Sequence, residues 1–220
     1  IRSSSIAMTL DTAGGNDDVA ISLNRLSASS FSANVTTGGG DDFLSLYAGE
    51  DVIGSTVQIV ADLGDGNDTA RQHINWEGFD LVGATSLWKT ELHGRDGDDS
   101  LSVLGELGNA SADVAGTLDL GLFGDAGNDQ ILFALDRLTL RGGTLRLRGN
   151  GFAGNDQLTL TGDIAGAGAI DAILRGNGAA DVLTVNANSS FGSVLVDGGA
   201  GIDSATVTGT LQAQIVNVEA

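Results

Sequence analysis

A short motif of glycine and aspartate recurs eight times along this chain of 220 residues, and this recurrence is the strongest constraint on its fold. One copy reads GLFGDAGNDQILF, from Gly121 to Phe133. Two positions before the aspartate, seven copies have glycine and the eighth has Ala179. Two positions after it, every copy has an apolar residue. The reference aspartates are Asp17, Asp42, Asp68, Asp99, Asp129, Asp156, Asp181 and Asp203.

The spacing and flanks of the motif predict a solenoid built from β-strands. Successive aspartates are 25, 26, 31, 30, 27, 25 and 22 residues apart, which is too long for a hairpin and suits one coil of a solenoid. Apolar and polar residues tend to alternate on both sides of the motif, and a period of two is the signal of a strand. Because no apolar period of 3.6 residues persists, we expect essentially no helix.

Each coil should contain a strand into the turn, a strand out of it and a shorter third strand. Candidates for the third strand are DVIG from Asp51, FDLVGA from Phe79 and DRLTLRGG from Asp136. The fold class predicted is all-β, a right-handed parallel β-helix of about eight coils of 22–31 residues with two to three strands each, in a single domain, 1–220. Strands stack about 4.8 Å apart, so the rod would be roughly 38 Å long. Outward positions should be polar, as at Thr159, Thr184, Arg146, Arg148 and Asp197.

The composition agrees with this fold and limits the partners. The chain has 34 glycines, which suit many turns, and no proline, which would remove ladder hydrogen bonds from the strands. The net charge of −19 argues against nucleic acid as a partner, because phosphate binding needs clustered Lys and Arg. The lack of cysteine excludes disulfides and thiolate metal sites. The sequence contains no run of 18 apolar residues, so it does not predict a membrane-spanning helix.

Stacking would place the eight aspartates in one column along an edge, each about 5 Å from the next. Like charges at that distance repel, and the ten Lys and Arg residues are scattered along the sequence. Calcium is the counter-ion that we expect, because it binds carboxylate and carbonyl oxygens, and Gly-Asn-Asp turns offer both. The alternative is a metal-free solenoid in which the aspartate side chains cap backbone amides of the turns.

The turns resemble the calcium-binding nonapeptide of the repeats-in-toxin (RTX, haemolysin-type) family, G-G-x-G-x-D-x-U-x, where U is apolar. GGAGIDSAT, Gly198 to Thr206, fits every position, and the copies from Gly94, Gly124 and Gly151 lack only the second glycine. The resemblance implies calcium between stacked turns, held by the aspartate carboxylates and glycine carbonyls. Since each coil has one such turn and not two, we expect one column of up to seven ions. The implied metal ligands are the eight reference aspartates with Gly15, Gly40, Gly66, Gly97, Gly127, Gly154 and Gly201.

Other candidate sites are weaker. His73 lies within the longest spacing and, with Trp76, Glu77 and Asp80, is a candidate binding loop or a solvated bulge. No Ser-His-Asp or zinc set can be assembled from two histidines, so we expect no enzyme and name no catalytic residue or organic cofactor. Ice binding would need a regular outward threonine ladder, of which LTLTGD from Leu158 is only a fragment.

The function expected is that of a structural, calcium-stabilised repeat module of a secreted or cell-surface protein, such as an adhesin, surface layer, matrix or filament subunit. One alternative is a polysaccharide-acting enzyme or carbohydrate-binding module on the same scaffold. Another is a self-assembling extracellular fibre, because neither end of the sequence shows a capping helix. The expected partners are other copies or neighbouring coils, with extracellular polysaccharide as a further candidate.

Overall fold

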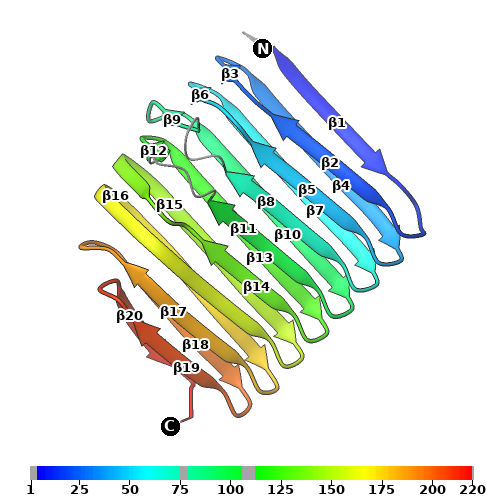
Figure 1. Ribbon diagram of the computed structural model, residues 1–220, viewed down its shortest axis with the longest axis vertical. Coiled ribbons are helices and arrows are strands. Elements are labelled where there is room, and N and C mark those ends of the chain that lie inside the picture. The colour runs from blue at the N-terminus through cyan, green and yellow to red at the C-terminus, as the bar shows by residue number, and fades with distance from the viewer. Residues whose placement is uncertain (1–3, 75–78, 106–111, 220) are drawn as a thin grey trace.

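The chain forms a parallel β-solenoid of about seven turns (Figure 1). The computed structural model describes residues 4–74, 79–105 and 112–219, and every regular element within those ranges is a β-strand. No described segment is a helix with the length and apolarity needed to cross a membrane. The predicted all-β parallel solenoid, without helix in the described ranges, is therefore confirmed.

Two faces and a line of short corner strands make up the coils. The long face contains β1 (Ser5–Asp11), β4 (Ser30–Gly39), β7 (Thr56–Asp65), β10 (Leu87–Asp96), β13 (Thr117–Ala126), most of β15 (Leu138–Ala153), the last part of β16 (Gln157–Gly178), β18 (Ser193–Ala200) and β20 (Gln212–Val216). The short face contains β2 (Asp18–Leu23), β5 (Phe43–Ala48), β8 (Thr69–Ile74), β11 (Ser100–Gly105), β14 (Gln130–Ala134), the first part of β16, β17 (Val182–Asn188) and β19 (Ser204–Thr208).

The corner strands are β3 (Leu26–Ser27), β6 (Val52–Ile53), β9 (Leu81–Val82) and β12 (Ala112–Val114), continued by the start of β15. The strands β6 and β9 and the start of β15 lie within the three segments predicted as third strands, so that prediction is confirmed. In the later coils β15 and β16 run continuously around the corner.

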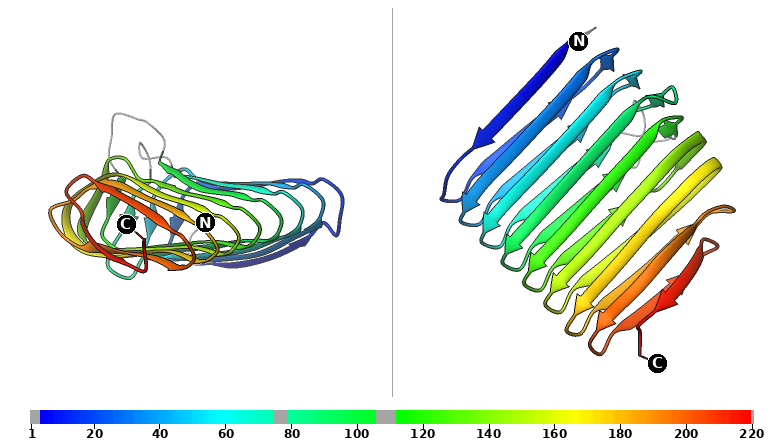
Figure 2. Two further views of the ribbon diagram at one scale, coloured as in Figure 1. Left: turned by 90° about the horizontal axis from the view of Figure 1, so that it is seen from below. Right: turned by 180° about the vertical axis from the view of Figure 1, so that it is seen from behind.

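The strands pair in parallel with their copies in the adjacent coils, and the register is kept except for one shift between Arg141 and Thr144, where β15 pairs with β16. Leu92 of β10, for example, lies beside Ala61 of β7 and Leu122 of β13. Figure 2 shows the long face as a row of aligned strands, and its end view shows the two faces close together in a flattened coil. This register carries the sequence repeat directly into the third dimension, because equivalent residues of successive coils become neighbours.

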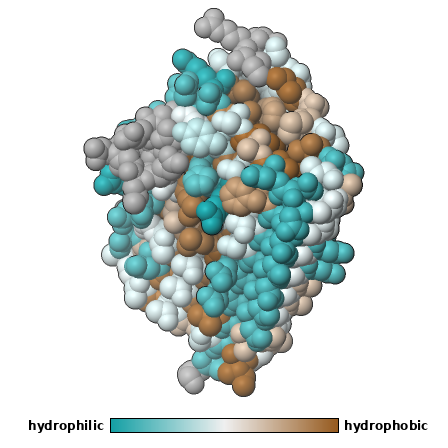
Figure 3. Space-filling model, turned by 45° about the vertical axis from the view of Figure 1, so that its right-hand side comes forward, coloured by the Kyte–Doolittle hydropathy of each residue, from teal (hydrophilic) through white to brown (hydrophobic). Residues whose placement is uncertain are grey.

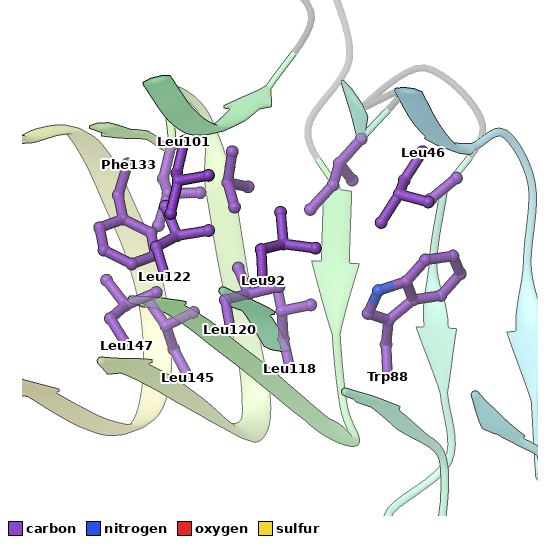
Figure 4. Close-up of a cluster of buried hydrophobic side chains, with 14 of the residues drawn as sticks. Leu46, Trp88, Leu92, Leu101, Leu118, Leu120, Leu122, Phe133, Leu145 and Leu147 are labelled. Carbon is purple, nitrogen blue, oxygen red and sulfur yellow. The ribbon is translucent and has the colours of Figure 1, made fainter. Parts of the chain in front are cut away.

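The core fills the narrow space between the two faces. Leu118, Leu120 and Leu122 of β13 are fully buried, and Leu122 lies beside the Phe133 ring of the opposite face (Figure 4). The residues predicted to point outward alternate with buried ones and are half-buried or exposed, as expected. Polar exceptions occur at Gln72, whose amide atoms have no hydrogen-bond partner among the described residues, and at Thr90, which accepts a hydrogen bond from the Trp88 indole.

The turn that follows each long strand has two positions with positive φ. The first lies two residues before the reference aspartate, where Gly127 has φ of 141° and Ala179 has φ of 78°. The second lies four residues before it, where Arg95, Asp125 and Phe152 have φ of 85°, 73° and 71°. Glycine adopts positive φ without strain, and Gly38, Gly64 and Gly199 take this second position in other turns.

Candidate functional site

The eight reference aspartates form a column along one edge of the solenoid, and each is hydrogen-bonded to the next coil. The backbone amide of Asp99 donates to Oδ1 of Asp129 at 2.8 Å, and the amide of Asp129 donates to Oδ1 of Asp156 at 2.8 Å. The same bond links every successive pair from Asp17 to Asp203 at 2.7–2.9 Å. The column is therefore a ladder in which the carboxylate of every reference aspartate from Asp42 to Asp203 caps an amide of the preceding coil.

A second ladder lies on the solvent side of the first and runs in the opposite direction. Here the residue before the aspartate accepts from the following coil, so that Oδ1 of Asp98 accepts from the amide of Asn128 at 2.7 Å. The ladder extends from Asn16 to Asn155 and ends at Ala180, which has no side-chain acceptor. Figure 3 turns this edge toward the viewer and shows a band of hydrophilic residues along it.

In a central turn, the two ladders and two amide–carbonyl bonds together pair four successive amides. At the turn of Asp129, the amides of Gly127 and Asp129 donate to the following coil, and those of Asn128 and Gln130 donate to the preceding coil, at 2.7–2.8 Å. Since four successive amides are bonded without a ligand, the arrangement has the features of the metal-free alternative raised by the sequence.

The other carboxylate oxygen of each turn, Oδ2, is buried and has no hydrogen-bond partner among the described residues in any of the eight aspartates. Seven of these aspartates are at most 3% exposed. Oδ2 of Asp129 faces the α-carbon of Gly124, five residues earlier, where a Cβ would collide with it. Glycine takes the equivalent place beside Asp99, Asp156, Asp181 and Asp203, and thereby makes room for the carboxylate. The first glycine of the nonapeptide pattern has this steric role here.

Burial changes the acidity of the column. Desolvation raises the pKa of Asp68, Asp99 and Asp129 to about 6 and that of Asp156 to about 7, because it disfavours the charged form. The pKa of Asp181 is also raised by burial. The amide hydrogen bond lowers each of these pKa values and a neighbouring carboxylate raises each of them, but both effects are smaller than desolvation.

Glu219 completes the ladder at the last coil. Its Oε2 accepts the amide of Asp203 at 2.7 Å, which is the bond that an aspartate of a further coil would make. Only 16 residues separate the two, against 22–31 between reference aspartates. A motif search anchored on Gly-Asn-Asp missed Glu219, because its local sequence, VNVEA, lacks the motif.

The glycines predicted as calcium ligands lie beside the aspartates, but most of their carbonyl oxygens face the equivalent glycine of the following coil. The carbonyl oxygen of Gly97 points at the α-carbon of Gly127, and that of Gly127 points at the α-carbon of Gly154. The same contact joins Gly15 to Gly40, Gly40 to Gly66, and Gly66 to Gly97, while Gly201 meets the carbonyl of Ala179. The structure thus stacks these glycines on one another, and their role as ligands stays a prediction.

The oxygen atoms along the column match calcium in type. Calcium takes six to eight oxygens. Each turn offers one carboxylate oxygen, Oδ2, that has no hydrogen-bond partner among the described residues. Beside the α-carbon of Gly94, the Oδ2 of Asp99 and the carbonyl oxygen of Gly124 both face the space that a Cβ would take. Within the described residues, no group of three or more His, Cys, Asp or Glu side chains is arranged to hold a metal ion. The donors are oxygens, which is the type that calcium prefers, but the described carboxylates alone do not form a site, so carbonyl oxygens would have to supply most of the ligands.

The candidate loop near His73 falls partly outside the described residues, since Trp76 and Glu77 belong to the range 75–78. His73 lies on β8 of the short face. Asp80 has a structural partner, because its Oδ1 accepts the amide of Asp113 from the following coil at 2.8 Å. Burial raises the pKa of Asp80.

No family model, no curated protein and no solved structure matches this chain.

Proposed function

We propose that this chain is a structural solenoid module of a secreted or cell-surface protein. The observation that carries the proposal is the uninterrupted in-register ladder along the turn edge, in which every coil is bonded to the next through a buried carboxylate. Such an edge resists separation of coils, because pulling two coils apart would leave both an amide and a buried carboxylate without partners. An adhesin, surface layer, matrix or filament subunit needs a stiff spacer of this kind.

Calcium binding along the column is the second part of the proposal. The resemblance to the RTX nonapeptide has functional meaning only if the turns bind calcium. The support is chemical: eight Oδ2 atoms are buried and have no hydrogen-bond partner within the described part of the chain, and the net charge is −19. A divalent cation would offset the repulsion between successive carboxylates when they are ionised. The eight reference aspartates, with adjacent glycine carbonyls, are the residues that would hold it.

Thermal unfolding followed by circular dichroism, in calcium and in chelator, tests the calcium part. We expect calcium to raise the melting midpoint of the wild type. Asp129→Asn keeps Oδ1 as the acceptor for the Asp99 amide but removes the charge, so it should reduce the calcium-dependent rise without lowering the midpoint in chelator. Asp171→Asn is the matched control, because Asp171 is exposed on the long face.

The two parts of the proposal fail separately. A wild-type midpoint that does not respond to calcium would refute calcium binding and leave the amide ladder as the sole link between turns. Turnover of any polysaccharide by the purified protein would contradict the structural role, whatever the calcium result.

Filament formation is a second candidate function, favoured by the edge strands. In the described chain, β1, β2 and β3 have a hydrogen-bonded strand on one side only, as do β19 and β20. Open strand edges pair readily with other chains. Electron microscopy of the purified protein with calcium distinguishes filaments from single short rods.

A further inference from the structure

The basic residues, scattered in the sequence, gather on the long face of the fold. Five of the ten Lys and Arg residues lie on the long face. They are Lys89 and Arg95 of β10, Arg146 and Arg148 of β15, and Arg175 of β16. Several pair with acids of neighbouring coils, such as Arg95 with Asp62 at 2.6 Å. This face therefore carries half of the basic residues of a chain whose net charge is −19.

A small hollow opens among these residues on the outer surface of β13, β15 and β16. It has a volume of about 70 Å³ and is lined by Phe123, Arg148, Gly149, Asn150, Ile173 and Arg175. The register explains it, because the short Asn150 lies between Phe123 and Arg175 in one outward row. The lining contains two guanidinium groups and no carboxylate.

The walls of the hollow are held in place from outside it. The ring of Phe123 stacks on His93 of the preceding coil, with centroids 4.6 Å apart and planes 16° from parallel. Arg148 donates through one terminal nitrogen to Asp119 at 2.7 Å, and the same nitrogen lies 3.4 Å from Glu91. Both acids are on strands N-terminal to β15, away from Arg175. The arginine is thus oriented before any ligand arrives.

Arg175 is the less constrained of the two arginines. Its Nε is 3.8 Å from Asp197, and its side chain is 45% exposed. A guanidinium has five N–H donors in a planar fork and binds carboxylates in two-point contacts. A carboxylate in the hollow would therefore be held by Arg175 and Arg148 while the carbon skeleton attached to it contacts Phe123 and Ile173.

We propose that this hollow binds the carboxylate of an acidic sugar, with a uronic-acid unit as the ligand class. Two guanidiniums select a carboxylate, and the Phe123 ring offers an apolar surface to the C–H face of a sugar ring. The volume admits the carboxylate and a few adjoining atoms, so the rest of the glycan would lie along the long face. The net charge of −19 repels long polyanions, and we expect the tightest binding for short oligosaccharides with one uronate.

Titration calorimetry with a disaccharide that carries one glucuronate tests the proposal, beside the matched neutral disaccharide, inorganic sulfate and a glutamate-containing peptide. We expect binding of the uronate disaccharide only. Arg175→Gln and Arg148→Gln should each weaken it about tenfold or more, as expected for loss of a charge-assisted contact. Arg146→Gln is the matched control, because Arg146 lies two residues from Arg148 on the same exposed face but outside the hollow, and should change affinity less than about twofold.

Several results would overturn the proposal. Equal binding of the neutral disaccharide would remove the role of the carboxylate, and equal binding of sulfate would reduce the hollow to a general anion site. Tighter binding of the peptide would identify a protein partner. Arg148→Gln leaves Asp119 without its arginine and can destabilise the fold, so Arg175→Gln decides the outcome, with the melting midpoint of each variant as the folding control.

Discussion

At the scale of single residues, the turn depends on two glycines with different roles. Gly127 is needed for its backbone conformation and for close stacking, since its α-carbon meets the carbonyl oxygen of Gly97. Gly124 has no such φ and is needed because the Asp129 carboxylate occupies the space of a side chain. One sequence motif therefore combines a conformational requirement with a steric one.

Replacing Gly127 by alanine should destabilise the protein strongly. The φ of 141° is unfavourable for alanine, and its Cβ would collide with backbone of the preceding coil. We expect a loss of about 3 kcal/mol or more in the free energy of unfolding, measured by urea denaturation. Gly54→Ala is the control: φ there is 53° and no atom lies within 4 Å of the added Cβ, so the loss should be about 1–2 kcal/mol. Equal losses in the two variants would show that stacking contacts do not matter.

At the scale of the elements, the two faces complement each other across the core. Gly149 breaks the apolar pattern at its inward position, and the structure explains the exception. A Cβ on Gly149 would lie 2.9 Å from a methyl carbon of Leu174 and 3.2 Å from the Phe133 ring of the opposite face. Glycine on one face thus compensates for a large side chain on the other, a relation that the sequence pattern of a single strand does not contain.

This complementarity predicts a coupled pair of substitutions. Phe133→Leu should leave a gap, and Gly149→Ala alone should overfill the site. Together they should cost less than the sum of the separate losses, with a coupling of about 0.5–3 kcal/mol in a double-mutant cycle. Additive losses would mean that the ring and the glycine do not share one space.

At the scale of the whole molecule, the buried carboxylates link stability to pH. The folded-state pKa values of about 6 to 7 lie above the ordinary aspartate pKa of 3.8 expected for the unfolded chain, so the folded state binds more protons between these values. The stabilising contribution is complete below about pH 4 and is lost as the pH rises through 6 to 7. In chelator, the melting midpoint should therefore be higher at pH 5 than at pH 8.

Calcium should reverse this preference, because protons and a cation compete for the same oxygens. The measurement is a series of melting curves across this pH range in chelator and in calcium. A midpoint in chelator that rises with pH would contradict the raised pKa values of the column.

The sequence by itself determined the solenoid, because a repeat of Gly-Asn-Asp in one frame and a period of two on both sides specify strands, corners and their stacking. It also identified the aspartates that form the column. It left open what those aspartates bind, since amide capping and calcium binding require the same residue types. Only the tertiary structure decided that each Oδ1 caps an amide of the preceding coil, that Glu219 closes the ladder, and that scattered arginines meet beside Phe123. The ladder contacts join residues 16 to 31 positions apart, and the hollow joins residues of three strands. Their geometry depends on how coils stack, which local patterns do not encode.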